Sequence, residues 1–350
     1  MIEEIKSKLG PRIPWAYFIK EENIADVAPL VYSEIKRLRI ENDFSGKTLK
    51  KLNNVYRSVL ANNIVLMNEL GKVLSSFQKA GFQAILLKGS ALINDVYKDP
   101  GMRVMRDIDL LVRKSDLKPV SEILGNLGYE NNSLGEEDFV KKISGRTIDI
   151  DIHTDFINAT RLKSRAGICN IDYAQVWENK RRIKIGDIDI FVLSKEDFLI
   201  DLCVHLVMHH GMNGLLWFLD IIYFLDAHKE IDLAKLAILA KKYSVKKPLY
   251  LTLCYLKETL KMQTTECVLG KLKYTPGFLE NIVFKEIKKG KEIPYAKFFF
   301  ALSSIKGLKN KAVFLKELVF PPVNILREKY AAKGTLSPYI AHFTNIIKGL

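Results

Sequence analysis

Residues 84–112 read AILLKGSALINDVYKDPGMRVMRDIDLLV, and this stretch decides the fold. It opens with a short apolar run that ends at Gly89-Ser90 and passes directly into a helical pattern of apolar residues. After the loop KDPGMR, charged and apolar side chains alternate over residues 106–112, which is typical of a half-buried strand. The order of strand, turn, helix and strand predicts a small α/β core.

Carboxylates gather on the second of these strands. Asp107 and Asp109 are two residues apart, so their side chains point to the same face of the strand. A second acidic strand is predicted at residues 147–156, where Asp149 and Asp151 also share a face. If the two strands are neighbours, three carboxylates converge, which suits a pair of Mg²⁺ ions. Alternatively, the aspartates only mark the solvated faces of two strands.

The Gly89-Ser90 turn is a candidate phosphate site. A strand that turns at these residues straight into a helix presents backbone N–H groups, a hydroxyl and the positive end of the helix dipole. Taken alone, a glycine-serine pair is only a turn. Its position ahead of two acidic strands is what favours phosphate binding.

This order of elements resembles the polymerase-β-like nucleotidyltransferase superfamily. Residues 86–130 look like a family of uncharacterised bacterial and archaeal nucleotidyltransferases with the motifs LKG-x-A-L, Y-x-x-P-G-x-R, D-I-D-L-L-V and L-G-Y. The resemblance continues in IDIDIHTDF, in HLVMHHGMNGLLWFLDIIYFLD and in PPVNILREKY. The eighteen positions from Gly89 to Asp107 exceed the superfamily's usual spacing, and the YKDPGMR segment accounts for the difference.

The resemblance implies a Mg²⁺-dependent nucleotidyltransferase that moves an NMP from an NTP to an acceptor hydroxyl and releases pyrophosphate. Asp107, Asp109 and Asp151 would be the catalytic carboxylates and the ligands of two Mg²⁺ ions, with Mn²⁺ as the other candidate. Asp149 is the second choice for the third carboxylate. Asp151 would also deprotonate the acceptor hydroxyl.

The resemblance also assigns the nucleotide contacts. Gly89 and Ser90 would hold the triphosphate, and Lys88 and Arg103 are candidate phosphate partners, because fixed cations stabilise charge that develops on the leaving group. Ordinary surface charge is the alternative interpretation of both cations. Candidate contacts to the base or the acceptor are His153, His205, His209, Trp217 and Asp220. A polar cluster between packed helices is the alternative for the last four.

The whole chain is predicted to be an α+β protein with a polymerase-β-like core, a small mixed sheet with helices. Residues 1–80 form an N-terminal helical segment, with two helices joined near Ser45-Gly46. Residues 81–193 form the nucleotidyltransferase core, which ends in a β-hairpin that turns at Gly186-Asp187. Residues 194–350 form a basic helical domain.

The excess of basic over acidic residues lies entirely in the last third of the chain. Of the formal net charge of +14, residues 1–230 contribute none, with 32 basic and 32 acidic side chains, whereas residues 231–350 hold 22 basic and 8 acidic. Such a region can attract nucleic acid, although lysines on solvated helix faces give the same pattern. The acceptor therefore stays open among a small molecule, a protein and RNA. The rival function is a non-catalytic nucleic-acid-binding or scaffold protein that keeps a degenerate core.

The remaining composition points to the cytoplasm. Four scattered cysteines, without a C-x-x-C pair, exclude a disulfide framework and a zinc knuckle. The N-terminus lacks the basic and apolar regions of a secretory signal. The most apolar stretch, residues 215–225, is too short for a transmembrane segment.

Overall fold

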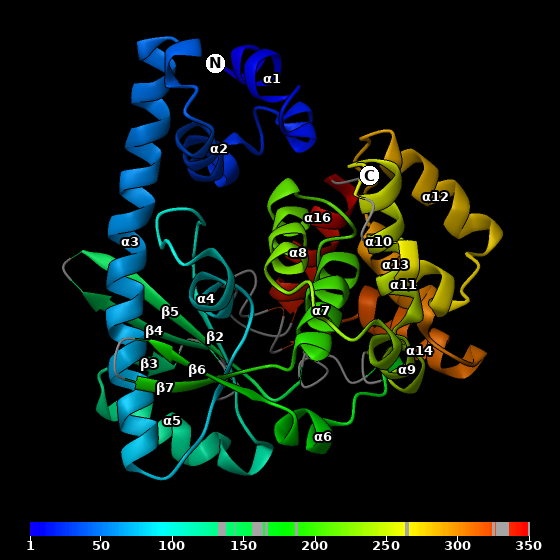
Figure 1. Ribbon diagram of the computed structural model, residues 1–350. Coiled ribbons are helices and arrows are strands. Elements are labelled where there is room, and N and C mark those ends of the chain that lie inside the picture. The colour runs from blue at the N-terminus through cyan, green and yellow to red at the C-terminus, as the bar shows by residue number, and fades with distance from the viewer. Residues whose placement is uncertain are drawn as a thin grey trace.

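The computed structural model describes residues 1–131, 138–143, 145–155, 164, 167–185, 188–262, 266–323, 326 and 336–348. Figure 1 shows a sheet with the long helix α3 along one side and a mass of helices on the other. This is the predicted α+β architecture of a mixed sheet between two helical regions. The predicted turn at Gly186-Asp187 and most of the PPVNILREKY segment lie outside the described residues.

The N-terminal segment holds the two predicted helices, α2 (Ile24–Leu38) and α3 (Gly46–Lys79). They meet where the sequence indicates, because the Ser45 hydroxyl caps α3 by accepting the Thr48 N–H. A further helix, α1 (Ile2–Leu9), was not predicted, although it is amphipathic and buries its apolar face. Short 3₁₀ turns lie at Pro14–Phe18 and Glu41–Asp43.

Seven strands form one mixed sheet among the described residues, in the order β3-β4-β5-β2-β1-β7-β6. Their bounds are β1 (Ile85–Leu86), β2 (Ile108–Leu111), β3 (Glu130–Asn131), β4 (Asp138–Ile143), β5 (Arg146–His153), β6 (Arg181–Ile185) and β7 (Ile188–Val192). The two acidic strands, β2 and β5, are parallel neighbours, and Asp109 lies opposite Asp151. The predicted hairpin is the antiparallel pair β6 and β7.

β4 was not predicted, because half of its residues are charged and only Phe139 is deeply buried. β2, in contrast, is buried along its whole length, and it lies near the middle of the sheet between β1 and β5. Asp109 of the first acidic motif is therefore carried by a buried strand in the middle of the sheet.

Two π-helical turns extend the helices nearest the core. α4 (Lys88–Leu92) continues into η3 (Ile93–Tyr97), and α7 (Lys195–Val204) continues into η6 (His205–His209). The other helices of the core are α5 (Leu117–Asn126), with the 3₁₀ turn Lys114–Asp116 before it, and α6 (Tyr173–Glu178). Single π-helical turns inside α-helices are frequent at functional sites.

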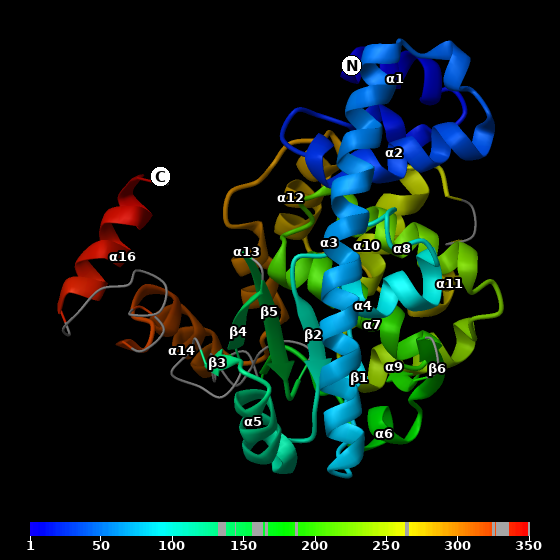
Figure 2. The ribbon, with the colours of Figure 1, turned by 90° about the vertical axis from the view of Figure 1, so that its left-hand side faces the viewer.

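After β7 the described chain is helical, as predicted. Figure 1 shows α7 and α8 between the sheet and the remaining helices, and Figure 2 shows α14 and α16 on the side away from α6 and α9. The bounds are α8 (Leu215–Ala227), α9 (Leu233–Lys242), α10 (Lys246–Glu258), α11 (Glu266–Leu272), α12 (Phe278–Lys288), α13 (Ala296–Ser304), α14 (Leu308–Val319) and α16 (Leu336–Lys348). Within the described ranges every helix is too short or too polar to cross a membrane. The division into three domains stays a prediction.

Candidate active site

Three of the predicted side chains meet on the two acidic strands. Asp109 on β2 and Asp151 on β5 are register partners, and His153 follows two residues later on the same face of β5. One ligand atom from each of these residues lies within 4.8 Å of the other two. We call Asp109, Asp151 and His153 the acidic cluster. The convergence of the two strands, which the alternating pattern predicts, is present.

Asp109 is the centre of this cluster and is almost fully buried. Its Oδ1 atom accepts hydrogen bonds from Lys88 Nζ at 2.5 Å and from His153 Nε2 at 2.6 Å. Because an ionised carboxylate only accepts, Nε2 of His153 carries the proton. Burial would raise the pKa of Asp109, but the Lys88 ammonium and the His153 hydrogen bond hold it well below its ordinary value.

The two carboxylates beside Asp109 show the opposite shift. Burial, together with the negative charge of Asp109, raises the pKa of Asp107 and raises that of Asp151 to about 7. Asp149 lies on the same face of β5, two residues before Asp151, and its pKa is raised by burial and by Asp138. Asp151, and not Asp149, is the register partner of Asp109, and its pKa is raised by the charges of both Asp109 and Asp107.

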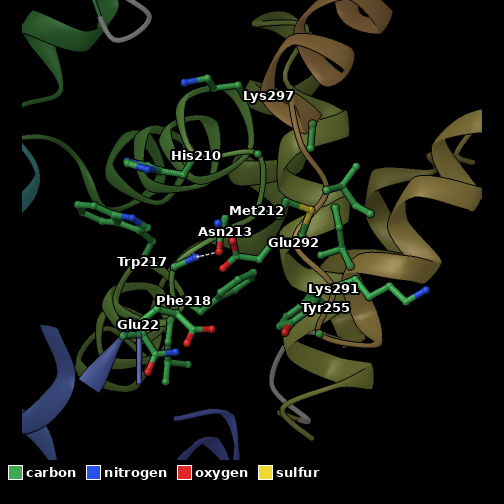
Figure 3. Close-up of a pocket in the computed structure, with 18 of the residues that line it drawn as sticks. Glu22, His210, Met212, Asn213, Trp217, Phe218, Tyr255, Lys291, Glu292 and Lys297 are labelled. Atoms are coloured by element: carbon green, nitrogen blue, oxygen red, sulfur yellow. Dashed lines mark hydrogen bonds between the residues drawn. The ribbon is translucent and has the colours of Figure 1, made fainter. Parts of the chain in front are cut away.

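A cavity of about 410 Å³ opens over the cluster. It is lined by the predicted residues Lys88, Gly89, Arg103, Asp107, Asp109, Asp151, His205, His209 and Trp217, and also by Val104, Arg106, His210 and Leu216. A second cavity of about 620 Å³ shares three of these residues, His209, His210 and Trp217. Figure 3 shows it between the loop that carries Asn213 and the segment that carries Lys291 and Glu292. The two cavities therefore adjoin each other and share part of their walls.

The two residues of the glycine-serine turn have different surroundings: Gly89 faces the cavity and Ser90 does not. Gly89 lines the cavity, and a Cβ atom added to it would lie 2.5 Å from Nη1 of Arg103, so only glycine fits beside that guanidinium. Ser90, however, is fully buried, and its hydroxyl donates to the Leu87 carbonyl at 3.0 Å. The hydroxyl therefore stabilises the turn in this structure.

Arg103 was predicted to contact phosphate, and Asp220 the base or the acceptor. In the structure the two side chains form an ion pair with each other. The guanidinium donates from Nε and Nη2 to the two carboxylate oxygens at 2.8 and 2.7 Å, and both side chains are buried. The Tyr97 hydroxyl donates to the same carboxylate at 2.9 Å. A direct contact from Asp220 to a base or an acceptor would require this bidentate ion pair to open.

The aromatic side chains beside this ion pair also contact one another. The Trp217 ring stacks on His210 with ring centroids 4.4 Å apart, and the Arg103 guanidinium carbon lies 5.8 Å from the Trp217 ring centroid. Nε2 of His210 lies 3.0 Å from Nε2 of His205. Burial lowers the pKa of His205 far below its ordinary value and, with Lys297, lowers that of His210 to about 4. The His205 and His210 imidazoles in the cavity wall are therefore neutral.

Asp201 is a further acidic residue near the site that the sequence analysis did not single out. It lies on α7 one helical turn before His205, and its side chain is fully buried. Burial raises its pKa to about 7, opposed by the nearby charge of Lys88. The available signal was a carboxylate within the apolar run FLIDLCV, where charged residues are rare.

The raised pKa of Asp201 predicts a pH-dependent stability. The folded state binds this proton more tightly than the unfolded state, so the stabilisation is present at low pH and is lost as the pH rises towards about 7. Asp201→Asn should therefore stabilise the protein more at pH 8 than at pH 5, by about 2–3 kcal/mol. Urea unfolding at the two pH values measures this difference.

The matched control is Asp226→Asn, which removes a carboxylate that is 73% exposed. Its effect on the free energy of unfolding should be small and similar at both pH values. An Asp201→Asn variant that behaves in the same way would contradict the prediction.

The comparisons with known proteins agree with this geometry. The profile of a family described as uncharacterised nucleotidyltransferase matches residues 11–261, which include the whole sheet and α7 to α10. The chain belongs to this family of uncharacterised nucleotidyltransferases. No curated protein and no solved structure matches the chain.

Proposed function

We propose that the protein is a nucleotidyltransferase that uses Mg²⁺ or Mn²⁺ to move an NMP from an NTP to an acceptor hydroxyl. The observation that carries this proposal is the pairing of Asp109 with Asp151 on parallel neighbouring strands, under a cavity of about 410 Å³. Membership of a nucleotidyltransferase family supports the reaction class.

The donor set fits a divalent cation. Carboxylate oxygens are ligands that Mg²⁺ and Mn²⁺ prefer. The raised pKa values of Asp107 and Asp151 come from burial and from the charge of Asp109, and a divalent cation would remove that repulsion. Asp109 and Asp151 would hold one ion, and Asp107 would contribute from the same cavity to a second. When bound, the ions would neutralise charge on the triphosphate and stabilise pyrophosphate as the leaving group.

The side chains of the chain itself would position the reactants. His153 fixes the Asp109 carboxylate through its 2.6 Å hydrogen bond. Asp151 would accept the proton of the acceptor hydroxyl, whose oxygen forms a bond to the α-phosphorus while the bond from that phosphorus to the bridging oxygen of pyrophosphate breaks. Gly89 would let the backbone approach the phosphates, since it carries no side chain of its own.

The acceptor would occupy the second cavity. That cavity adjoins the first at His210 and Trp217, which line both. Residues 287–297, which form one of its walls, lie outside the range that the family profile matches. Whether the acceptor is a small molecule, a protein side chain or an RNA terminus would therefore depend on residues 287–297, which lie outside the family profile. Nucleic-acid binding through residues 231–350 stays a prediction, testable by its salt dependence.

Labelled nucleotides test the reaction. The full-length protein is incubated with Mg²⁺, cell extract and each NTP in turn, labelled either at the α- or at the γ-phosphorus. We expect the α-label to appear on an acceptor and the γ-label to appear only in pyrophosphate, because the bond between the α- and β-phosphates is the one that breaks. Transfer of the γ-label would indicate a kinase, and no Mg²⁺-dependent transfer of either label would contradict the proposal.

A further inference from the structure

Asp201 is a buried carboxylate without a hydrogen bond. Neither of its two oxygens has a hydrogen-bond partner among the described residues, and the side chain has no exposed surface. A buried polar group of this kind is costly, and native proteins rarely keep one without a use for it. The position of Asp201 indicates what the use is.

Asp201 lies behind the cavity that contains the acidic cluster. It precedes His205 by one turn of α7, and His205 lines that cavity together with Lys88 and Asp109. The groups whose charges act on Asp201 are Lys88, Asp109 and His153, and Lys88 is the only permanently cationic one. The negative charge of Asp201 acts in turn on Lys88.

The Lys88 ammonium is bound to the Asp109 carboxylate, which a divalent cation would need as a ligand. Its ammonium donates to Asp109 at 2.5 Å and lies 3.5 Å from Nε2 of His153, and only 16% of its side chain is exposed. Its backbone adopts φ 44°, a left-handed conformation that is uncommon outside glycine and is found at functional sites. An ammonium and a divalent cation repel each other strongly at such short range in a buried site.

We propose that Asp201 is a second anchor for the Lys88 ammonium, which moves from Asp109 to Asp201 when a divalent cation binds the acidic cluster. This inference rests on the proposed function. Asp201 is then a positioning residue: its carboxylate accepts the displaced ammonium at a fully buried position. This accounts for the two Asp201 oxygens that lack a partner among the described residues: they would accept the Lys88 ammonium, which in this structure is bound to Asp109.

A double-mutant cycle on Mn²⁺ affinity tests the proposal, with the bound fraction of Mn²⁺ measured by electron paramagnetic resonance on the full-length chain without nucleotide. Asp201→Asn should weaken Mn²⁺ binding about tenfold, because Lys88 has no second anion and stays on Asp109. In a Lys88→Met background, where no ammonium has to move, the same substitution should leave Mn²⁺ affinity unchanged. Asp201→Ser provides the same comparison if the asparagine variant does not fold.

Asp197→Asn is the matched control. Asp197 is also fully buried, lies one turn earlier on α7 and has one oxygen without a partner among the described residues, but its charged neighbours are Lys235 and Glu196. Its replacement should leave Mn²⁺ affinity unchanged in both backgrounds. An Asp201→Asn effect that persists with Lys88→Met would mean that Asp201 attracts the ion directly, and it would overturn the proposal, as would no effect at all. Absence of Mn²⁺ binding by the unmodified protein would overturn the proposed function together with this inference.

Discussion

Asp109→Asn is expected to reduce nucleotidyl transfer by about 10³-fold or more, because it removes the one charge on which Lys88, His153 and the proposed metal site all converge. The amide keeps the size of the carboxylate, so the sheet should remain intact. Transfer of the α-label to the acceptor at saturating Mg²⁺ measures the loss. Circular dichroism and cooperative urea unfolding show whether the fold is kept.

A matched control lies on a neighbouring part of the same sheet. Asp189 on β7 also belongs to an Asp-x-Asp motif, but its side chain is 41% exposed and it forms an ion pair with the exposed Arg182 at 3.5 Å. Asp189→Asn should therefore leave transfer unchanged. Activity retained by Asp109→Asn, or lost equally in both variants, would contradict the assignment of the site to the acidic cluster.

Arg103→Leu is expected to destabilise the protein by about 3–5 kcal/mol, because it leaves the Asp220 carboxylate buried without its counterion. The interaction joins η3 and the loop before β2 to α8, since Tyr97 shares the same carboxylate. The free energy of unfolding in urea measures this effect. The double variant Arg103→Leu with Asp220→Leu should recover part of the loss, because no charge then remains buried.

Arg182→Leu is the control for this second experiment. Arg182 and Asp189 form an ion pair at the surface, where the side chains are 65% and 41% exposed. Such pairs contribute about 0–1 kcal/mol. If Arg103→Leu costs no more than Arg182→Leu, and instead weakens NTP binding, then the phosphate role that the sequence predicts for Arg103 would be favoured over the structural one.

The parts of the fold that follow from local pattern could be predicted. Alternation with a period of two places Asp107 with Asp109, and Asp149 with Asp151, on shared faces, and both strands are present as neighbours in the sheet. The Ser45 cap and the hairpin of β6 and β7 are equally local. β4 was missed because half of its residues are charged, and its pairing with β5 compensates for this weak apolar pattern.

The parts of the site that depend on distant packing could not be predicted. Arg103 and Asp220 are 117 positions apart, and Lys88 and Asp109 are 21 apart, so no spacing rule connects either pair. Whether Asp149 or Asp151 completes the cluster depends on the register of β5 against β2, which a sequence pattern leaves open. Asp201 was overlooked because a helix of this pattern usually buries only apolar residues.

The winding of the chain at His205–His209 has one more consequence. In an α-helix, residues five apart differ by about 140° in direction and cannot touch, whereas a π-helical turn closes its backbone ring over five residues. The backbone N–H of His210 bonds the His205 carbonyl at 3.3 Å, and the two imidazoles meet. The one extra residue in this π-helical turn therefore brings the imidazoles together beside Trp217. Homologues that lack this one residue would present a differently shaped wall where the two cavities adjoin, even with every histidine retained.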